Sequence, residues 1–171
     1  GFSADKTIVG NQEFHTIHIN GMPVMGEKGY PELPAITDLL SVASSNLKIE
    51  VINQTSKEYK TFNIAPSKGS DNQSEATDSN ILDISDVYNK DAYFPESNTK
   101  LLSVQSYRSY PFASIRLYPV QYNPVAKTIK CCTEITYRVS WNKKDFLSES
   151  ATAGDENLPL NYKRMPSLLR G

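Results

Sequence analysis

Four side chains of this sequence could support nucleophilic or metal chemistry: His15, His18, Cys131 and Cys132. A cysteine nucleophile requires a histidine base within hydrogen-bonding reach, and a zinc site requires three or four converging ligands. Side chains at odd spacings along a strand point to opposite faces, so neither the histidines nor the cysteines converge. A Cys–His dyad would depend on tertiary contact alone. The sequence therefore predicts no catalytic residue, no metal site and no cofactor.

The two cysteines are expected to act as independent thiols. Neighbouring strand positions do not close a disulfide, because their Cβ atoms point apart. Cys131 falls in an apolar stripe, where burial raises the pKa of a thiol and leaves it inert, and Cys132 falls on the opposite face. We expect Cys131 in the core and Cys132 near the surface.

Two further patterns favour a loop over a binding site. The sequence Pro-Ser-Lys-Gly-Ser at 66–70 resembles a phosphate loop but lacks its first glycine and its Gly-Lys-Ser order. Asp71, Glu75 and Asp78 offer oxygen ligands without the spacing and the bend glycine of a calcium loop. We interpret residues 66–80 as one long polar loop exposed to solvent.

The elements that position these side chains are predicted to be strands. Asn20-Gly21 predicts a hairpin turn that returns through residues 22–25. Alternating polarity in 128–141 gives the clearest single strand. Seven or eight strands at this spacing predict an all-β fold, an antiparallel two-sheet β-sandwich. The expected strands and extended segments are 13–19, 34–43, 47–51, 59–64, 101–107, 112–118 and 128–141.

Size and charge limit the domain organisation and the partners. A chain of 171 residues is close to the size of one domain, which we expect over 12–141, after a polar leader at 1–11 and before a polar tail at 142–171. The net charge of −1 provides no basic surface for nucleic acid. No apolar stretch approaches the ~20 residues that cross a bilayer. We therefore expect neither nucleic-acid binding nor a membrane span.

Four blocks of the sequence resemble the proregions of gingipain-type cysteine proteases. The first carries a glycine-x-proline-x-leucine-proline signature, and the blocks follow one another in the order of that family. They are Gly29–Ile36, Ile64–Gly69, Tyr88–Pro95 and Pro119–Thr128, the last running on towards Thr133–Ile135. The resemblance covers about residues 25–141 and implies a β-sandwich propeptide.

The same resemblance implies a function. Proregions of this family assist the folding of a secreted Arg- or Lys-specific cysteine peptidase of the Bacteroidetes. They hold the zymogen latent by occupying its active-site cleft. The chain itself is then a non-catalytic inhibitor, secreted or held at the bacterial surface or in the periplasm. Its partner is a cognate peptidase domain, either in the same polypeptide or acting in trans.

The resemblance also implies that one basic side chain blocks the pocket meant for a substrate's Arg or Lys. Lys90 is the preferred candidate, because it lies in a non-periodic, exposed segment inside the third block. Arg108 is the rival, at the end of a predicted strand. Arg164, which closes the segment 160–164, is the expected processing site, with 142–171 as a linker to a peptidase domain.

A different class of function stays open beside this one. A stand-alone β-sandwich at a cell surface could bind a glycan or a protein without any protease partner. The ten tyrosines could supply a sugar-stacking platform, although in β-rich domains they usually pack in the core or across strands.

Overall fold

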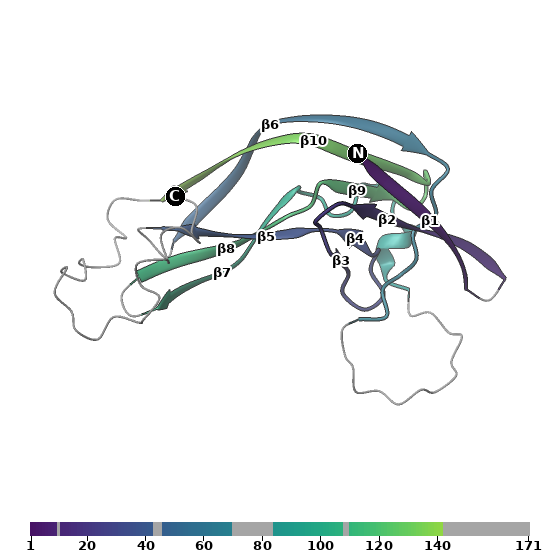
Figure 1. The fold of residues 1–171 in the computed structure, drawn as a ribbon, viewed down its shortest axis with the longest axis horizontal. Coiled ribbons are helices and arrows are strands. Elements are labelled where there is room, and N and C mark those ends of the chain that lie inside the picture. Colours follow the sequence, from purple (N-terminus) through teal and green to yellow (C-terminus); the bar gives the residue numbers. More distant parts are fainter. Residues whose placement is uncertain (10, 43–45, 70–83, 108–109, 142–171) are drawn as a thin grey trace. The chain divides into compact units, whose positions relative to one another are not determined.

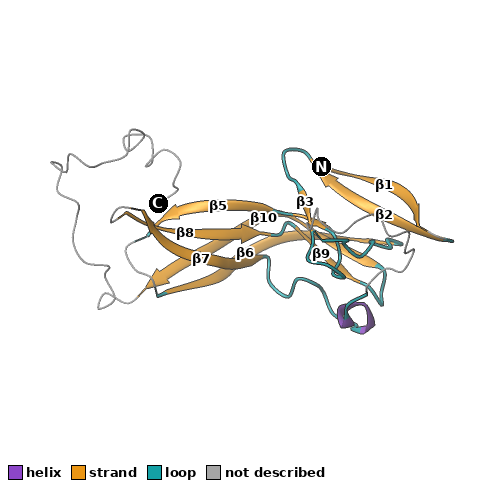
Figure 2. Cartoon of the chain, turned by 90° about the horizontal axis from the view of Figure 1, so that it is seen from below, coloured by secondary structure: helices purple, strands orange, loops and turns teal. Residues whose placement is uncertain are grey.

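The described chain is built almost entirely from strands. The structure is a computed structural model that describes residues 1–9, 11–42, 46–69, 84–107 and 110–141. Among these residues only a 3-10 turn, η1 (Asp86–Asn89), is helical (Figure 1, Figure 2). The strands are β1 (Phe2–Val9), β2 (Gln12–Ile19), β3 (Val24–Met25), β4 (Leu33–Pro34), β5 (Ile36–Ser41), β6 (Leu47–Lys60), β7 (Thr99–Tyr107), β8 (Tyr110–Leu117), β9 (Val120–Asn123) and β10 (Thr128–Trp141).

The chain divides into two compact units. Unit 1 comprises residues 1–36, 54–98 and 118–135, and unit 2 comprises residues 37–53, 99–117 and the chain from residue 136. Each unit is thus assembled from three separate stretches of sequence. The long neighbouring strands β6 and β10 contribute residues to both units.

The core of unit 1 is a cluster of apolar side chains from strands far apart in the sequence. Removing one large aliphatic side chain from water contributes roughly 1.5–3 kcal/mol, so this cluster is a major source of stability. Phe2, Ile19, Phe62, Tyr88 and Phe94 pack against it from the side. Its buried members are Ile17, Leu33, Ile64, Val120, Tyr122, Ile129 and Cys131.

Antiparallel hairpins and ladders surround this core. β1 and β2 pair along their full length, from Phe2↔Ile19 to Val9↔Gln12. β3 pairs with β4, and β9 pairs with the start of β10. Gly21 turns the chain after β2 with a φ of 77°, a conformation that a side chain disfavours.

Unit 2 contains the three-stranded sheet β5-β8-β7. β8 is its central strand, and its residues Ala113 and Ile115 are fully buried. β7 pairs with β8 from Thr99↔Leu117 to Tyr107↔Tyr110, with a register shift between Leu101 and Ser103. The small Ala113 and the β-branched Ile115 suit this central, buried position.

The predicted all-β antiparallel fold is confirmed, but three local predictions are wrong. Residues 1–11, predicted as a polar leader, contain β1, which has little apolar alternation because most of its side chains are exposed. Residues 22–25 return along β2 only at the single bridge Ile19↔Met22, after which β3 pairs with β4. The strand expected at 47–51 runs on without a break into the start of the one expected at 59–64, as β6, while residues 61–64 lie beyond the end of β6.

The polar centre of β6 explains the last of these errors. The residues between Ile52 and Tyr59 are all polar, yet they stay extended beside β10. Thr133 of β10 donates its hydroxyl to the backbone oxygen of Thr55, 3.3 Å away. A partner strand satisfies the backbone of a segment whose own side chains give no apolar signal.

Residues 70–80 of the expected loop and the expected tail at 142–171 lie outside the described residues.

Candidate functional site

The four sequence blocks singled out above meet in unit 1. Pro31 and Pro66 form an antiparallel bridge, which joins the first block to the second. Further contacts join the third block to the other three. Just ahead of the third block, the Ser85 N–H donates to the Gly29 oxygen of the first block. The Tyr88 hydroxyl donates to the Ile64 oxygen of the second block, and Phe94 exchanges backbone hydrogen bonds with Tyr122 of the fourth. Segments separated by tens of residues thus build one local structure around residues 85–98, here called the η1 segment.

The first half of the η1 segment is fixed by its backbone and by Tyr88. The Ser85 N–H donates to the Gly29 oxygen over 3.0 Å, and the Tyr88 hydroxyl donates to the Ile64 oxygen over 3.1 Å. Burial, with the nearby Tyr122 and Glu32, raises the pKa of Tyr88 far above its usual range. Tyr88 therefore stays protonated and remains a hydrogen-bond donor.

The second half is fixed by β9. Phe94 and Tyr122 exchange two backbone hydrogen bonds of 2.8 Å each. The Gln121 side chain donates from Nε2 to the Pro95 oxygen over 2.7 Å. Asn98, itself buried, donates from Nδ2 to the Tyr118 oxygen over 2.7 Å. These contacts leave little freedom to the chain on this side of Lys90.

Asn123 fixes the middle of the η1 segment. Its Nδ2 donates to the Asp91 carboxylate over 2.8 Å, and its Oδ1 accepts from the Ala126 N–H over 3.0 Å. Only 7% of Asn123 is exposed, so both ends of the amide are used in a dry setting. A hydrogen bond to a carboxylate is about twice as strong as one between neutral groups.

Lys90 lies between these anchors and points a positive charge at solvent. It directly follows η1, is exposed, and has an extended backbone with φ −98° and ψ 129°. Its N–H donates to the Val87 oxygen over 3.1 Å. Its ammonium makes no hydrogen bond or ion pair with any residue that the structure describes. A fixed backbone thus carries a cation that pairs with none of the described residues.

The other two basic residues predicted to have a role, Arg108 and Arg164, lie outside the described residues. The strands that flank Arg108 are described, and they pair as far as Tyr107↔Tyr110. Two residues of the sequence, Arg108 and Ser109, connect these paired positions. Lys90 is therefore the predicted site residue whose surroundings the structure gives.

The cysteines take the positions predicted for independent thiols. Cys131 is buried in the core of unit 1, and burial raises its pKa to about 11. Cys132 is half-buried on the other face, where Asn98 Nδ2 donates to its sulfur over 3.4 Å. Burial raises the pKa of Cys132 as well. Neither thiol has the lowered pKa of a nucleophile.

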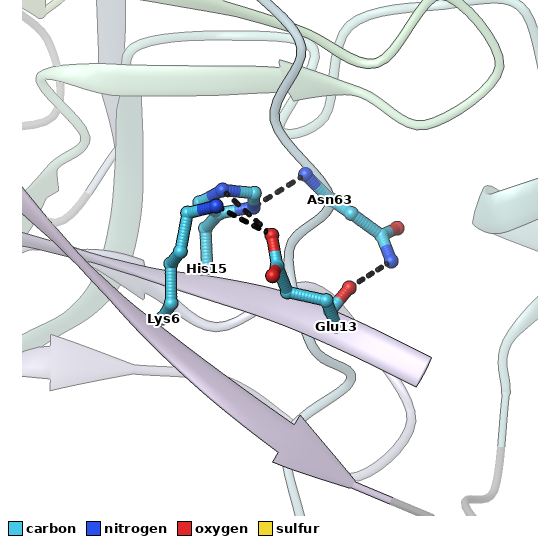
Figure 3. A network of polar contacts seen from close by, with 4 residues as sticks. All are labelled: Lys6, Glu13, His15 and Asn63. Atoms are coloured by element: carbon cyan, nitrogen blue, oxygen red, sulfur yellow. Dashed lines mark hydrogen bonds and ion pairs between the residues drawn. The ribbon is translucent and has the colours of Figure 1, made fainter. Parts of the chain in front are cut away.

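Both histidines make polar contacts, and Figure 3 shows those of His15 with Glu13 and Asn63. His15 Nδ1 accepts the Asn63 N–H over 3.2 Å, and its Nε2 lies 3.9 Å from the Glu13 carboxylate. Lys6 pairs with the same carboxylate over 2.8 Å and, by its hydrogen bond and charge, lowers the pKa of Glu13. His18 lies 3.3 Å from the Asp5 carboxylate. Among the described residues no group of three or more His, Cys, Asp or Glu side chains could hold a metal.

The segment compared with a phosphate loop is an internal turn where it is described. Ser67 is buried, donates its hydroxyl to the Gly26 oxygen over 3.1 Å, and accepts the Gly69 N–H over 3.2 Å. A Cβ on Gly26 would come within 2.6 Å of the Ser67 Cβ, so this close approach requires glycine. Asp71, Glu75 and Asp78 lie outside the described residues.

Sequence reasoning missed the buried amides that organise the site. Gln121 and Asn123 are 5% and 7% exposed, and all four residues of β9 are buried. Their signal in the sequence is two uncharged polar residues in a short strand that ends in a turn. This pattern says nothing about which distant loop they bind.

No helix in the described parts of the chain is long and apolar enough to span a membrane.

Comparison with known proteins gives consistent relatives. The family described as Propeptide_C25 matches residues 6–159. Gingipain R2 of Porphyromonas gingivalis is 34% identical over 137 residues, which are 80% of this chain and 18% of that protein. Gingipain R1 of the same organism is 34% identical over 146 residues, 82% of this chain and 14% of that protein. The chain thus spans less than a fifth of the length of these relatives.

Two solved structures share the fold. A chain from a complex of the pro- and mature domains of RgpB from Porphyromonas gingivalis matches with a TM-score of 0.80 and 25% identity, over 98% of this chain and 85% of that one. A structure that concerns the zymogenic latency of gingipain K from the same organism matches with a TM-score of 0.64 and 23% identity, over 81% and 80%. The second likeness concerns the fold alone.

Proposed function

Since the chain belongs to the Propeptide_C25 family, we propose that it is the proregion of a secreted bacterial gingipain-like cysteine endopeptidase. It assists the folding of the catalytic domain and keeps that domain latent by occupying the active-site cleft. The observation that carries this proposal is the match, over 98% of the chain, to a chain from a complex of pro- and mature domains. A propeptide is a non-catalytic part of its precursor, in agreement with the engaged histidines and the inert thiols.

Lys90 is the side chain that we propose enters the specificity pocket. A peptidase that cleaves after Arg or Lys needs an anionic pocket, and an exposed ammonium that pairs with no described residue suits it. The anchors on either side of Lys90 reduce the entropy lost on binding, because the backbone is already ordered. A specific inhibitor of this kind buries on the order of 1,600 Å² in total, so other loops must add contacts.

Arg108 is the second candidate, and the pairing of β7 with β8 favours it. The two strands stay paired up to Tyr107↔Tyr110, so a basic residue follows directly on the last described pair of this hairpin. A guanidinium binds a carboxylate through two parallel hydrogen bonds, which an ammonium does not reproduce. Arg164 is the proposed processing site, where the peptidase would remove the proregion.

The test is inhibition by the purified chain added in trans. We expect it to inhibit an Arg- or Lys-specific gingipain-type catalytic domain at micromolar concentration or below and to spare trypsin. No inhibition of the cognate enzyme at that concentration would reject the proposal and favour a surface binding module.

Point variants identify the blocking residue. If Lys90 is the anchor, Lys90→Ala weakens inhibition by roughly 2 kcal/mol or more, the scale of an interface hot spot. Thermal stability should not change, because the ammonium has no described partner. Lys57→Ala, at another exposed lysine, is the matched control. Full inhibition by Lys90→Ala together with a loss in Arg108→Ala would transfer the role to Arg108.

A further inference from the structure

We propose that Gln121 and Asn123 form a clamp that protects the Lys90–Asp91 peptide bond from proteases that cleave after lysine. The inference rests on the proposed function for its purpose, since a peptidase that binds Lys90 would otherwise cut its own inhibitor. Its structural content is independent of that function. It concerns only whether an exposed lysine in this setting is a substrate.

The clamp is built into three consecutive residues of β9. Gln121 and Asn123 are two positions apart, so their side chains leave the strand on the same face. They bind the η1 segment at the Pro95 oxygen and at the Asp91 carboxylate. Between them, the backbone of Tyr122 binds that of Phe94. Gln121 Nε2 also lies 3.4 Å from the Glu96 oxygen.

Anchors stand within two residues of Lys90 on both sides. Tyr88 holds the chain through the Ile64 oxygen, and Asp91, the residue after the scissile bond, is held by Asn123. A protease cuts a folded chain when the segment opens locally, and the rate follows the population of the open form. Opening here requires the Asp91 contact to break together with a neighbouring anchor. Lys90 is therefore accessible to solvent without being free to enter an active site as a substrate.

The test is cleavage at Lys90 by trypsin, which is not the proposed partner. The cleavage rate in the intact chain is divided by the rate in a synthetic peptide of residues 85–98, and each variant is compared with its own peptide. This correction is needed because Asp91 itself affects the intrinsic rate. We expect strong protection of the unmodified chain at Lys90.

Two variants open the clamp from its two sides. Asp91→Ala removes the exposed acceptor and leaves the buried amides in place. Asn123→Asp keeps an oxygen for the Ala126 N–H, loses the donor, and sets two carboxylates against each other. We expect each to reduce the protection at Lys90 at least about tenfold, the effect of losing one hydrogen bond to a charged group. Asn53→Asp, the same change at an exposed position of β6, should have no effect.

Two outcomes would overturn the clamp: unmodified chain cut at Lys90 as fast as the peptide, or full protection in both folded variants. If Asn123→Asp does not fold, Asp91→Ala decides alone. The proposed function fails separately, when the chain does not inhibit the cognate peptidase although Lys90 is protected from trypsin.

Discussion

Replacing each of the adjacent cysteines with serine compares the two faces of β10 with a nearly isosteric change. Cys131 belongs to the apolar cluster of unit 1, and its sulfur makes no hydrogen bond with a described residue. Burying a hydroxyl without a partner costs about 1–3 kcal/mol in proteins. We therefore expect Cys131→Ser to lower the free energy of unfolding by about 2 kcal/mol.

Cys132→Ser should behave differently, because its surroundings are polar. The sulfur lies 3.4 Å from Asn98 Nδ2 and 4.0 Å from Gln54 Oε1, so a hydroxyl there faces one donor and one acceptor, and side-chain shifts can close the hydrogen bonds. With both bonds available we expect a change within about 0.5 kcal/mol. The expected loss of unfolding free energy is thus about four times larger at Cys131 than at Cys132. Such a difference between neighbouring residues indicates a strand with one apolar and one polar face.

Urea unfolding of the two variants measures this difference. The midpoint should fall in Cys131→Ser at an unchanged slope against urea, which indicates a loss of stability without a change in the surface exposed. Cys131→Ala is the control, since it removes the sulfur without burying a hydroxyl and should cost less than serine. Equal losses in the two serine variants, or a greater loss in Cys131→Ala, would refute the assignment of the faces.

Three further outcomes follow from the geometry. Burial raises the pKa of Cys131 to about 11. The contribution of its protonated thiol to the free energy of unfolding is therefore complete below the ordinary thiol pKa of about 8.5 and is lost as the pH rises towards about 11. The fall in unfolding free energy over that window should be shallower in Cys131→Ala. Tyr88→Phe removes the bond to the Ile64 oxygen and should cost about 1 kcal/mol, measured by urea unfolding; a neutral result would mean that water replaces the bond. Gly26→Ala sets a methyl group against Ser67 and should cost about 1–3 kcal/mol in thermal unfolding, whereas a neutral result would show that the turn can move.

A strand could be predicted from the sequence where one of its faces is buried and the other is more exposed. In β10, Ile129 and Cys131 are buried while Lys130 and Cys132 are less so, and the alternation was plain. β1 has no such contrast, because it is held by its backbone ladder with β2 rather than by an apolar face. A strand of this kind is recognisable only when its partner is known.

The site was predictable in its exposed residue and not in its support. An irregular polar stretch with a lysine predicts exposure, and Lys90 is exposed. Its anchors come from β9 and from the Ile64 region, which are tens of residues away. Buried amides such as Asn123 look like ordinary turn residues in the sequence, since their partners depend on tertiary structure. Whether Lys90 or Arg108 blocks a peptidase stays a prediction.

The discontinuous make-up of unit 1 has a consequence for its synthesis on the ribosome. The core cluster joins Ile17 to Ile129 and Cys131, and Ile129 follows Ile17 by 112 positions in the sequence. At about 5–20 residues per second, roughly 6 to 22 s pass between the emergence of these residues. During that interval β2 and β4 have no β9 or β10 to cover them. Until the last strands arrive, the early strands avoid aggregation in one of two ways. Either a chaperone holds them, or their own tendency to associate with other chains is weak.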